Sequence, residues 1–309
     1  MMRRWPKRLL IVLVVTVAAC AVWWIWYSKR DYGAVFLQRK GQLLQSDRAT
    51  AVTTPKTTVY DLKLVSASGL VADARMRVPN RQGKFPGVLL AAGLETGKRV
   101  IDLIEERDDM VMLAVDYGWR GEFDISTLPR FCRAMETIRG RAADAVPRML
   151  LTLEFLAQQP YVDPQQLVVV GVSYGSYLAL PAAALDPKVG RLILVQGGGE
   201  MGAVIAANTR RWQAPFSPRL TAWIGKIMLL PYQPELWIRR IAPRPVTFIA
   251  SRTDPEFPVA AIEAVFARAA RPKELVWHDT AHVAPDAAAI IAELGRVVVG
   301  QLGTIDHSL

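Results

Sequence analysis

Hydrophobic and polar positions divide the chain into an apolar N-terminal run, a polar segment and a long region of alternating patterns. Residues 9–27 contain no charge, and Thr16 is their only clearly polar member. As a helix this run would be about 28 Å long, close to the apolar thickness of a bilayer. Residues 28–55 are polar and lack strong periodicity. We therefore predict a membrane anchor over 1–30, with a transmembrane helix at 9–27, and a stalk and lead-in over 31–56.

From residue 57 onward, short apolar runs alternate with longer helix-like stretches, a pattern typical of buried strands connected by helices. The predicted strands are 59–64, 70–78, 87–93, 110–115, 167–170, 192–195, 246–250 and 274–277. The predicted helices are 96–107, 130–158, 175–185, 257–269 and 284–300. This order predicts an α/β domain over 57–309, with a mostly parallel sheet and helices on both faces.

The alternation is interrupted between two predicted strands, over residues 200–243. This segment is helix-like and contains Trp212, Trp223 and Trp237. An insertion at this place would lie over the carboxyl ends of the strands, where ligands bind in open α/β sheets. We expect it to form a cap.

Charge is concentrated at the N-terminus. Of the formal net charge of +10, residues 1–40 carry eight basic residues against Asp31, so the remainder is weakly basic and does not indicate a nucleic-acid partner. Four basic residues precede the apolar run and two follow it. The positive-inside rule then places the N-terminus in the cytoplasm and the domain on the extracytoplasmic, periplasmic side. The alternative is a lipoprotein anchored at Cys20, because Val17-Ala18-Ala19 precedes it as in a lipoprotein cleavage site.

The strand at 167–170 leads directly into Gly171-Val172-Ser173-Tyr174-Gly175, and a predicted helix follows. This is the Gly-x-Ser-x-Gly pattern of a nucleophile elbow, in which a sharp turn exposes the serine hydroxyl above the sheet. Because a serine is a weak nucleophile at neutral pH, it needs a neighbouring base. The chain has three histidines, and His282 follows the last predicted strand in a polar loop, whereas His278 ends that strand and His307 lies in the C-terminal tail.

A histidine base needs a carboxylate to hold its orientation. Asp254 follows the strand at 246–250 in a turn, which gives the chain order Ser173, Asp254, His282 expected for this arrangement. Glu256 is the rival acid.

The backbone N–H groups of Tyr174 and Leu94 are the predicted oxyanion donors, with Gly93 the neighbouring option. Asp116, Tyr117 and Arg120 would line the pocket or hold a loop by a salt bridge. No Cys/His cluster has metal-ligand spacing, so we expect neither metal nor cofactor.

With these residues in place, the chain resembles the α/β-hydrolase superfamily over about 57–300, and most the bacterial serine esterases related to dienelactone hydrolases and acetyl xylan esterases. The stretches that carry the resemblance are "QPYVDPQQLVVVGVSYGSYLALPAAALDPKV" and "RPVTFIASRTDPEFP". The resemblance implies a Ser–His–Asp triad, no metal, and ester hydrolysis through an acyl-enzyme. Two features depart from it: dienelactone hydrolases proper use a cysteine where this chain has Ser173, and Ala92-Gly93-Leu94 lacks the His-Gly signature of many esterases and lipases.

The predicted function is therefore cleavage of a carboxylic ester in a small-molecule or lipid-like substrate. Peptidase or acyltransferase activity on the same triad is the first alternative, because fold does not determine the substrate. A catalytically dead, membrane-tethered binding scaffold is the second.

Overall fold

The computed structural model describes residues 5–93, 96–118 and 123–302 of the chain. These residues fall into two compact units, 1–35 and 36–309.

The N-terminal unit is built on α1 (Trp5–Ser28). The side chains of Val12, Trp23 and Ile25 are between 50% and 62% exposed, and the Trp23 and Tyr27 rings stack at 5.1 Å. Residues 9–27 are thus helical, as predicted. Among the described residues no single helix meets the length and hydropathy expected of a membrane span; residues 12–28 and 32–40 meet them only when taken together, as a pair of helices bent by 65°.

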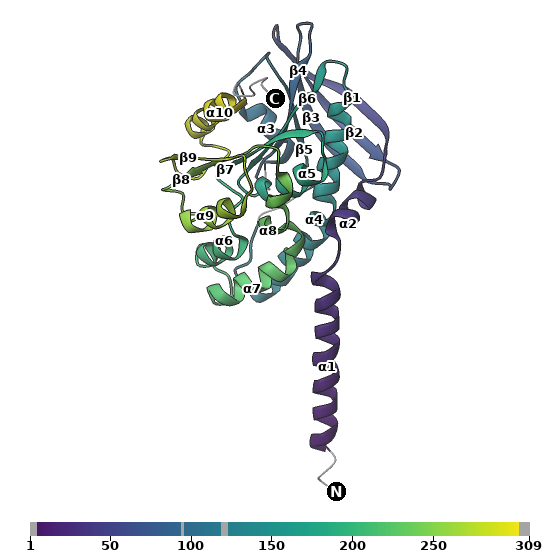
Figure 1. Cartoon of the computed structure of the whole chain (residues 1–309), viewed down its shortest axis with the longest axis vertical. Helices are drawn as coiled ribbons and strands as arrows, with labels where there is room; N and C mark the ends of the chain where they lie inside the picture. Colours follow the sequence, from purple (N-terminus) through teal and green to yellow (C-terminus); the bar gives the residue numbers. More distant parts are fainter. Residues whose placement is uncertain (1–4, 94–95, 119–122, 303–309) are drawn as a thin grey trace. The chain divides into compact units, whose positions relative to one another are not determined.

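The second unit contains a nine-stranded sheet in the order β1-β2-β3-β5-β4-β6-β7-β8-β9 (Figure 1). Its strands are β1 (Leu43–Thr53), β2 (Thr57–Ser66), β3 (Val71–Pro79), β4 (Phe85–Ala91), β5 (Val111–Val115), β6 (Val162–Val172), β7 (Val189–Val195), β8 (Val246–Ser251) and β9 (Lys273–His278). The first three strands pair antiparallel, and those from β5 to β9 pair parallel. The predicted α/β architecture is confirmed.

The stalk predicted over 31–56 is wrong in its larger part. This segment contains α2 (Tyr32–Lys40) and β1, and β1 pairs with β2 along most of its length. Every residue of β1 after Leu43 is exposed, because the strand is at the sheet edge with neither face covered. A strand exposed on both faces has no buried side, so its sequence carries no alternation to detect.

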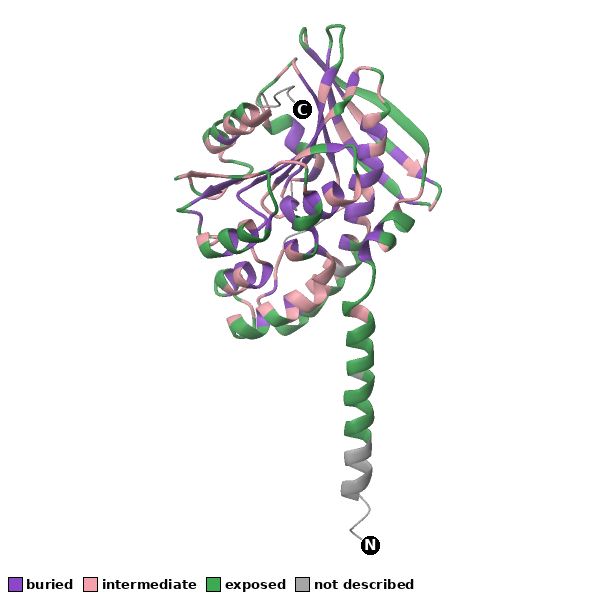
Figure 2. Cartoon of the chain, viewed as in Figure 1, coloured by how far each residue is buried: buried purple, intermediate pink, exposed green. Residues whose placement is uncertain are grey.

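Two helices flank the parallel strands where the chain order predicts them. Helix α4 (Leu128–Ala157) starts with the Thr127 hydroxyl accepting a hydrogen bond from the Arg130 backbone N–H. Helix α5 (Gly175–Leu185) is buried for most of its length, which explains its uniformly apolar sequence. Figure 2 shows the parallel strands and α5 mostly in purple, so the core lies around them.

The helix predicted over 96–107 is much shorter. A 3₁₀ turn (Gly97–Arg99) leads into α3 (Val100–Leu103), and Ile104 is already extended. The buried Arg77 guanidinium donates to the carbonyl oxygens of Ile101, Ile104 and Glu105. These carbonyl oxygens accept hydrogen bonds from an arginine side chain. In a longer helix they would accept them from the backbone N–H groups of the next turn, so the helix ends early.

The insertion between β7 and β8 is helical, as predicted. It contains α6 (Met201–Asn208), α7 (Pro218–Met228), α8 (Pro234–Trp237) and two 3₁₀ turns (Leu230–Tyr232 and Ile238–Ile241). Helix α9 (Val259–Arg268) follows β8, and α10 (Ala288–Leu302) is the last described helix. We refer to residues 201–241 as the cap insertion.

Candidate active site

Ser173 lies in the tight turn between β6 and α5. Its φ is +52°, a left-handed conformation that costs a non-glycine residue of order 1–3 kcal/mol. The flanking glycines are required by close packing: a Cβ on Gly175 would lie 1.9 Å from the Ala91 carbonyl oxygen, and one on Gly171 would lie 2.7 Å from the Ala179 Cβ. The turn can therefore form only with glycine at both places.

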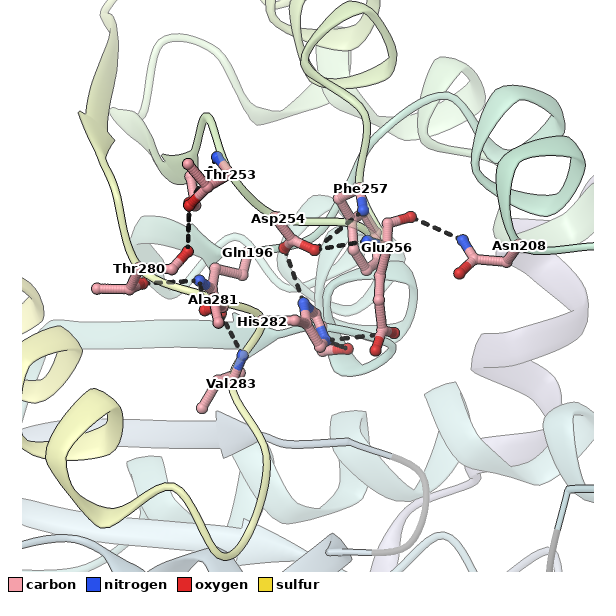
Figure 3. A network of polar contacts seen from close by, with 12 residues as sticks. Gln196, Asn208, Thr253, Asp254, Glu256, Phe257, Thr280, Ala281, His282 and Val283 are labelled. Carbon is pink, nitrogen blue, oxygen red and sulfur yellow. Dashed lines mark hydrogen bonds and ion pairs between the residues drawn. The ribbon is translucent and has the colours of Figure 1, made fainter. Parts of the chain in front are cut away.

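The strained turn brings the Ser173 hydroxyl to His282. The Ser173 Oγ is 2.8 Å from the His282 Nε2, and the His282 Nδ1 is 2.7 Å from the Asp254 Oδ2. Three side chains from separate loops, after β6, β8 and β9, thus form one hydrogen-bonded chain at the carboxyl edge of the sheet. Figure 3 shows the imidazole of His282 lying between Asp254 and Glu256.

Asp254 is fixed by its own turn. Its Oδ1 accepts hydrogen bonds from the backbone N–H groups of Glu256 (2.7 Å) and Phe257 (3.2 Å), and its side chain is 1% exposed. The Phe257 ring stacks on the His282 imidazole with centroids 5.5 Å apart. The carboxylate therefore presents its remaining oxygen to the imidazole in a single orientation.

The rival acid, Glu256, contacts the other side of the histidine. Its Oε2 is 3.5 Å from the His282 Nε2, while its Oε1 pairs with the Arg211 guanidinium of the cap insertion. Glu256 therefore lies on the side of the imidazole that faces Ser173, and Asp254 on the opposite side.

Gln196 holds the loop that carries His282, and sequence reasoning missed it. Its Nε2 donates to the Ala281 carbonyl oxygen (2.8 Å) and to the Thr280 Oγ1 (3.1 Å), and its Oε1 accepts from the Val283 N–H (2.6 Å). The side chain is fully buried, and its φ is +44°. The available signal was a polar residue directly after the apolar strand at 192–195, followed by three glycines.

Of the two predicted oxyanion donors, Leu94 lies outside the described residues. The neighbouring option, Gly93, lines the cavity at Ser173, as does Tyr174. Tyr174 is the residue before the first turn of α5, so its N–H is at the positive end of that helix. Burial raises the pKa of the Tyr174 phenol to about 12, so this group is uncharged at neutral pH.

The remaining polar candidates are apart from this chain of hydrogen bonds. The His278 Nδ1 is 2.8 Å from the Thr280 Oγ1, and burial lowers the pKa of His278. Asp116 accepts from the Gly118 N–H, and the Tyr117 hydroxyl donates to the Ala92 carbonyl oxygen. Arg120 and His307 lie outside the described residues.

The Ser173 and His282 side chains open into a cavity of about 610 Å³, within the usual range of ligand pockets. Residues from the cap insertion, α4, α10 and the parallel strands line it, and most are apolar. Among the residues that the structure describes, no group of three or more His, Cys, Asp or Glu side chains is arranged to hold a metal ion.

Comparison with known proteins finds similarity in structure but no match by sequence. No protein-family model matches the sequence, and no curated protein matches it. Acetyl xylan esterase 1 from a Thermoanaerobacterium species superposes with a TM-score of 0.64 and 16% identity, over 90% of this chain and 94% of that one. An acetyl xylan esterase from a Paenibacillus species gives 0.62 and 16%, over 89% and 93%.

A cold-adapted esterase from an Arctic intertidal metagenomic library is also similar, with a TM-score of 0.58 and 15% identity, over 82% of this chain and 98% of that one. At identities this low, the likeness concerns the fold.

Proposed function

Since the chain has the α/β-hydrolase fold, we propose that it is a serine hydrolase that cleaves carboxylic esters through an acyl-enzyme at Ser173. The hydrogen-bonded chain from Ser173 through His282 to Asp254 is the single observation that carries this proposal. Such an arrangement activates a serine hydroxyl in unrelated folds, which makes geometry the proper criterion. The esterase names of the structural neighbours favour an ester as the substrate.

In the proposed mechanism, the Ser173 Oγ attacks the ester carbonyl carbon while the His282 Nε2 accepts its proton. Asp254 stabilises the imidazolium through the Nδ1 hydrogen bond, and its second oxygen stays bound to two backbone amides. The protonated Nε2 then donates to the leaving alcohol oxygen. A water molecule, deprotonated by the same nitrogen, hydrolyses the acyl-enzyme and regenerates Ser173.

The negative oxygen formed during attack requires donors that are already in place. We assign one donor to the Tyr174 N–H at the start of α5 and the second to the segment at 93–94, with Leu94 as the preferred residue. The place of Tyr174 directly after Ser173 and at the N-terminus of α5 supports the first of these assignments.

The test is kinetic. Ser173→Ala should lower kcat for p-nitrophenyl acetate by on the order of 10⁴-fold or more, with the thermal unfolding temperature maintained. Ser126→Ala is a matched control, because Ser126 lies outside the cavity. A folded Ser173→Ala protein that keeps the activity of the wild type contradicts the proposal.

The N-terminal helix is the proposed membrane anchor, with the catalytic domain on the periplasmic side. The exposed apolar side chains of α1 between Val12 and Ile25 support an apolar surrounding. If the proposal holds, the full-length protein remains in the membrane fraction after carbonate washing. Replacing Val15 and Val22 by aspartate should release it, and retention of that variant in the membrane would contradict the anchor.

A further inference from the structure

The cavity at Ser173 extends along one face of the parallel sheet, toward the amino ends of the strands. Its wall on this side is formed by Val88 and Leu90 of β4, Met112 of β5 and Val170 of β6. These side chains share a face, because residues two apart on a strand point the same way. Ala92 lies at the rim of the cavity, the end that carries Ser173 and His282. Because Gly87 of β4 pairs with Val111 of β5, Met110 at the far end lies about six residues along the strand direction from Ala92. The cavity therefore follows the strands for on the order of 20 Å.

The facing wall is one side of α10. Its cavity-lining residues recur every three or four positions and are Ile291, Leu294, Gly295, Val298, Val299 and Leu302. Gly295 is at the centre of this stripe, and a Cβ built on it would meet no atom within 4 Å. The hollow between α10 and the sheet, here called the α10 lobe, thus has open space beside Gly295.

Helix α10 leaves apolar surface uncovered. Leu294 is its single buried residue, whereas Ile291, Val298 and Leu302 are only half-buried. Figure 2 shows α10 in pink and green, in contrast to the purple strands. The early end of α3 contributes, because Leu103 is 38% exposed and Ile104 lines the same lobe. Apolar hollows of this kind bind apolar ligands in preference to water.

Polar side chains line the cavity at both ends: Arg107, which pairs with Asp109, lies at the far end beside Met110, and a cluster of three lies near His282. Glu256, Arg211 and Asn208 line it near the His282 Nε2, the atom that would protonate a leaving alcohol. The leaving group therefore fits this polar end, next to the cap insertion. An ester carbonyl held at Ser173 then directs its acyl group into the α10 lobe.

We propose that the α10 lobe is an acyl-chain site, and that the substrates are esters of long-chain fatty acids. This inference rests on the proposed esterase function, since Ser173 defines which end of the ester reaches the lobe. Each methylene group buried in the lobe should raise kcat/KM by about threefold to fourfold until the lobe is filled.

The first experiment measures kcat/KM of the full-length protein for p-nitrophenyl acetate and p-nitrophenyl dodecanoate in one detergent. The test variant is Gly295→Leu, which places a side chain in the open space of the lobe. The control is Gly300→Leu, on the same helix but exposed, with open space around its Cβ and no part in the lining. Both substitutions favour the helix, so both proteins should fold.

The expected result is a wild-type preference for dodecanoate over acetate that falls at least tenfold in Gly295→Leu and stays unchanged in Gly300→Leu. Serine-dependent acetate hydrolysis with no preference for the longer ester, or an equal change for both esters in Gly295→Leu, overturns the acyl-chain site and leaves the esterase function standing.

A second experiment does not depend on turnover. A photoactivatable long-chain fatty acid is irradiated with the full-length protein, and the labelled peptides are mapped by mass spectrometry. Labels should fall on α10 and β4 peptides, drop severalfold in Gly295→Leu and persist in Gly300→Leu. No label on these peptides overturns the site. Labelling there in a protein that hydrolyses no ester at Ser173 refutes the esterase function, and with it the assignment of the bound chain as an acyl group.

Discussion

The two ends of the cavity differ in the contacts that hold their side chains in place. At the rim, Ser173, His282 and Asp254 are held by directional hydrogen bonds, a strained backbone and close contacts. In the α10 lobe, most of the described lining side chains are apolar, and Arg107 at the far end is held by its ion pair with Asp109. If the two proposals hold, one end of the cavity determines the reaction and the other determines the substrate preference. Orienting the three side chains at the rim requires particular donor and acceptor atoms. Binding an apolar chain in the lobe requires only volume and apolar surface.

The largest expected effect separates the two carboxylates at the rim. Asp254→Asn removes the charge that stabilises the imidazolium and should lower kcat by about 10³–10⁴-fold. Glu256→Gln is the matched change on the opposite side of the imidazole and should lower kcat by less than about tenfold. Steady-state kinetics of both variants on one ester measures the two losses. Equal losses in kcat would mean that the two acids share the role of stabilising the imidazolium.

Two glycines test the contrast between close packing and open space. Gly175→Ala should destabilise the protein by about 3 kcal/mol or more, because the new Cβ would overlap the Ala91 carbonyl. Gly295→Ala should stabilise it by about 0.5–1 kcal/mol, because alanine favours the helix and meets no neighbour. Urea unfolding curves measure both, and a destabilised Gly295→Ala would show that the lobe is filled.

Gln196 should matter through His282 rather than through substrate. Gln196→Ala leaves the Val283 N–H and the Ala281 carbonyl without their partners, so the loop can shift. A shift of about 1 Å can cost about 10²-fold in rate. We expect kcat to fall tenfold to a hundredfold with KM nearly unchanged. A loss confined to KM would place Gln196 in substrate binding.

The smallest expected effect concerns pH. Burial lowers the pKa of His278, although the carboxylates of Glu293, Asp254 and Asp279 act in the opposite direction. The folded state therefore binds this proton less readily than the unfolded state, whose histidine pKa is about 6.5. The contribution of neutral, buried His278 to the free energy of unfolding is therefore complete above a pH of about 6.5 and is lost as the pH falls below it. The unfolding temperature should drop less between pH 8 and pH 5 in His278→Gln than in the wild type, and an equal drop would contradict this.

Much of the rim could be predicted because its chemistry needs particular residue types at particular places. The elbow glycines are required by two close backbone approaches, and the chain order of Ser173, Asp254 and His282 follows strand order. Gln196 could not be predicted, because its role depends on a contact with a loop more than eighty residues away.

Two predictions about the fold, the stalk over 31–56 and the long helix over 96–107, were wrong for similar reasons. Strand β1 is exposed on both faces and so carries no periodicity, and α3 is ended by Arg77, a residue from β3. The α10 lobe follows from that early end and from a glycine on a distant helix, so it becomes visible only when the elements are packed.

Covalent labelling with a fluorophosphonate, followed by peptide mapping of the folded full-length protein, tests directly whether Ser173 is the nucleophile. We expect one stoichiometric adduct at Ser173, which is lost in Ser173→Ala and forms much more slowly in His282→Ala. Labelling at another serine, or none at Ser173 in folded protein, would contradict it.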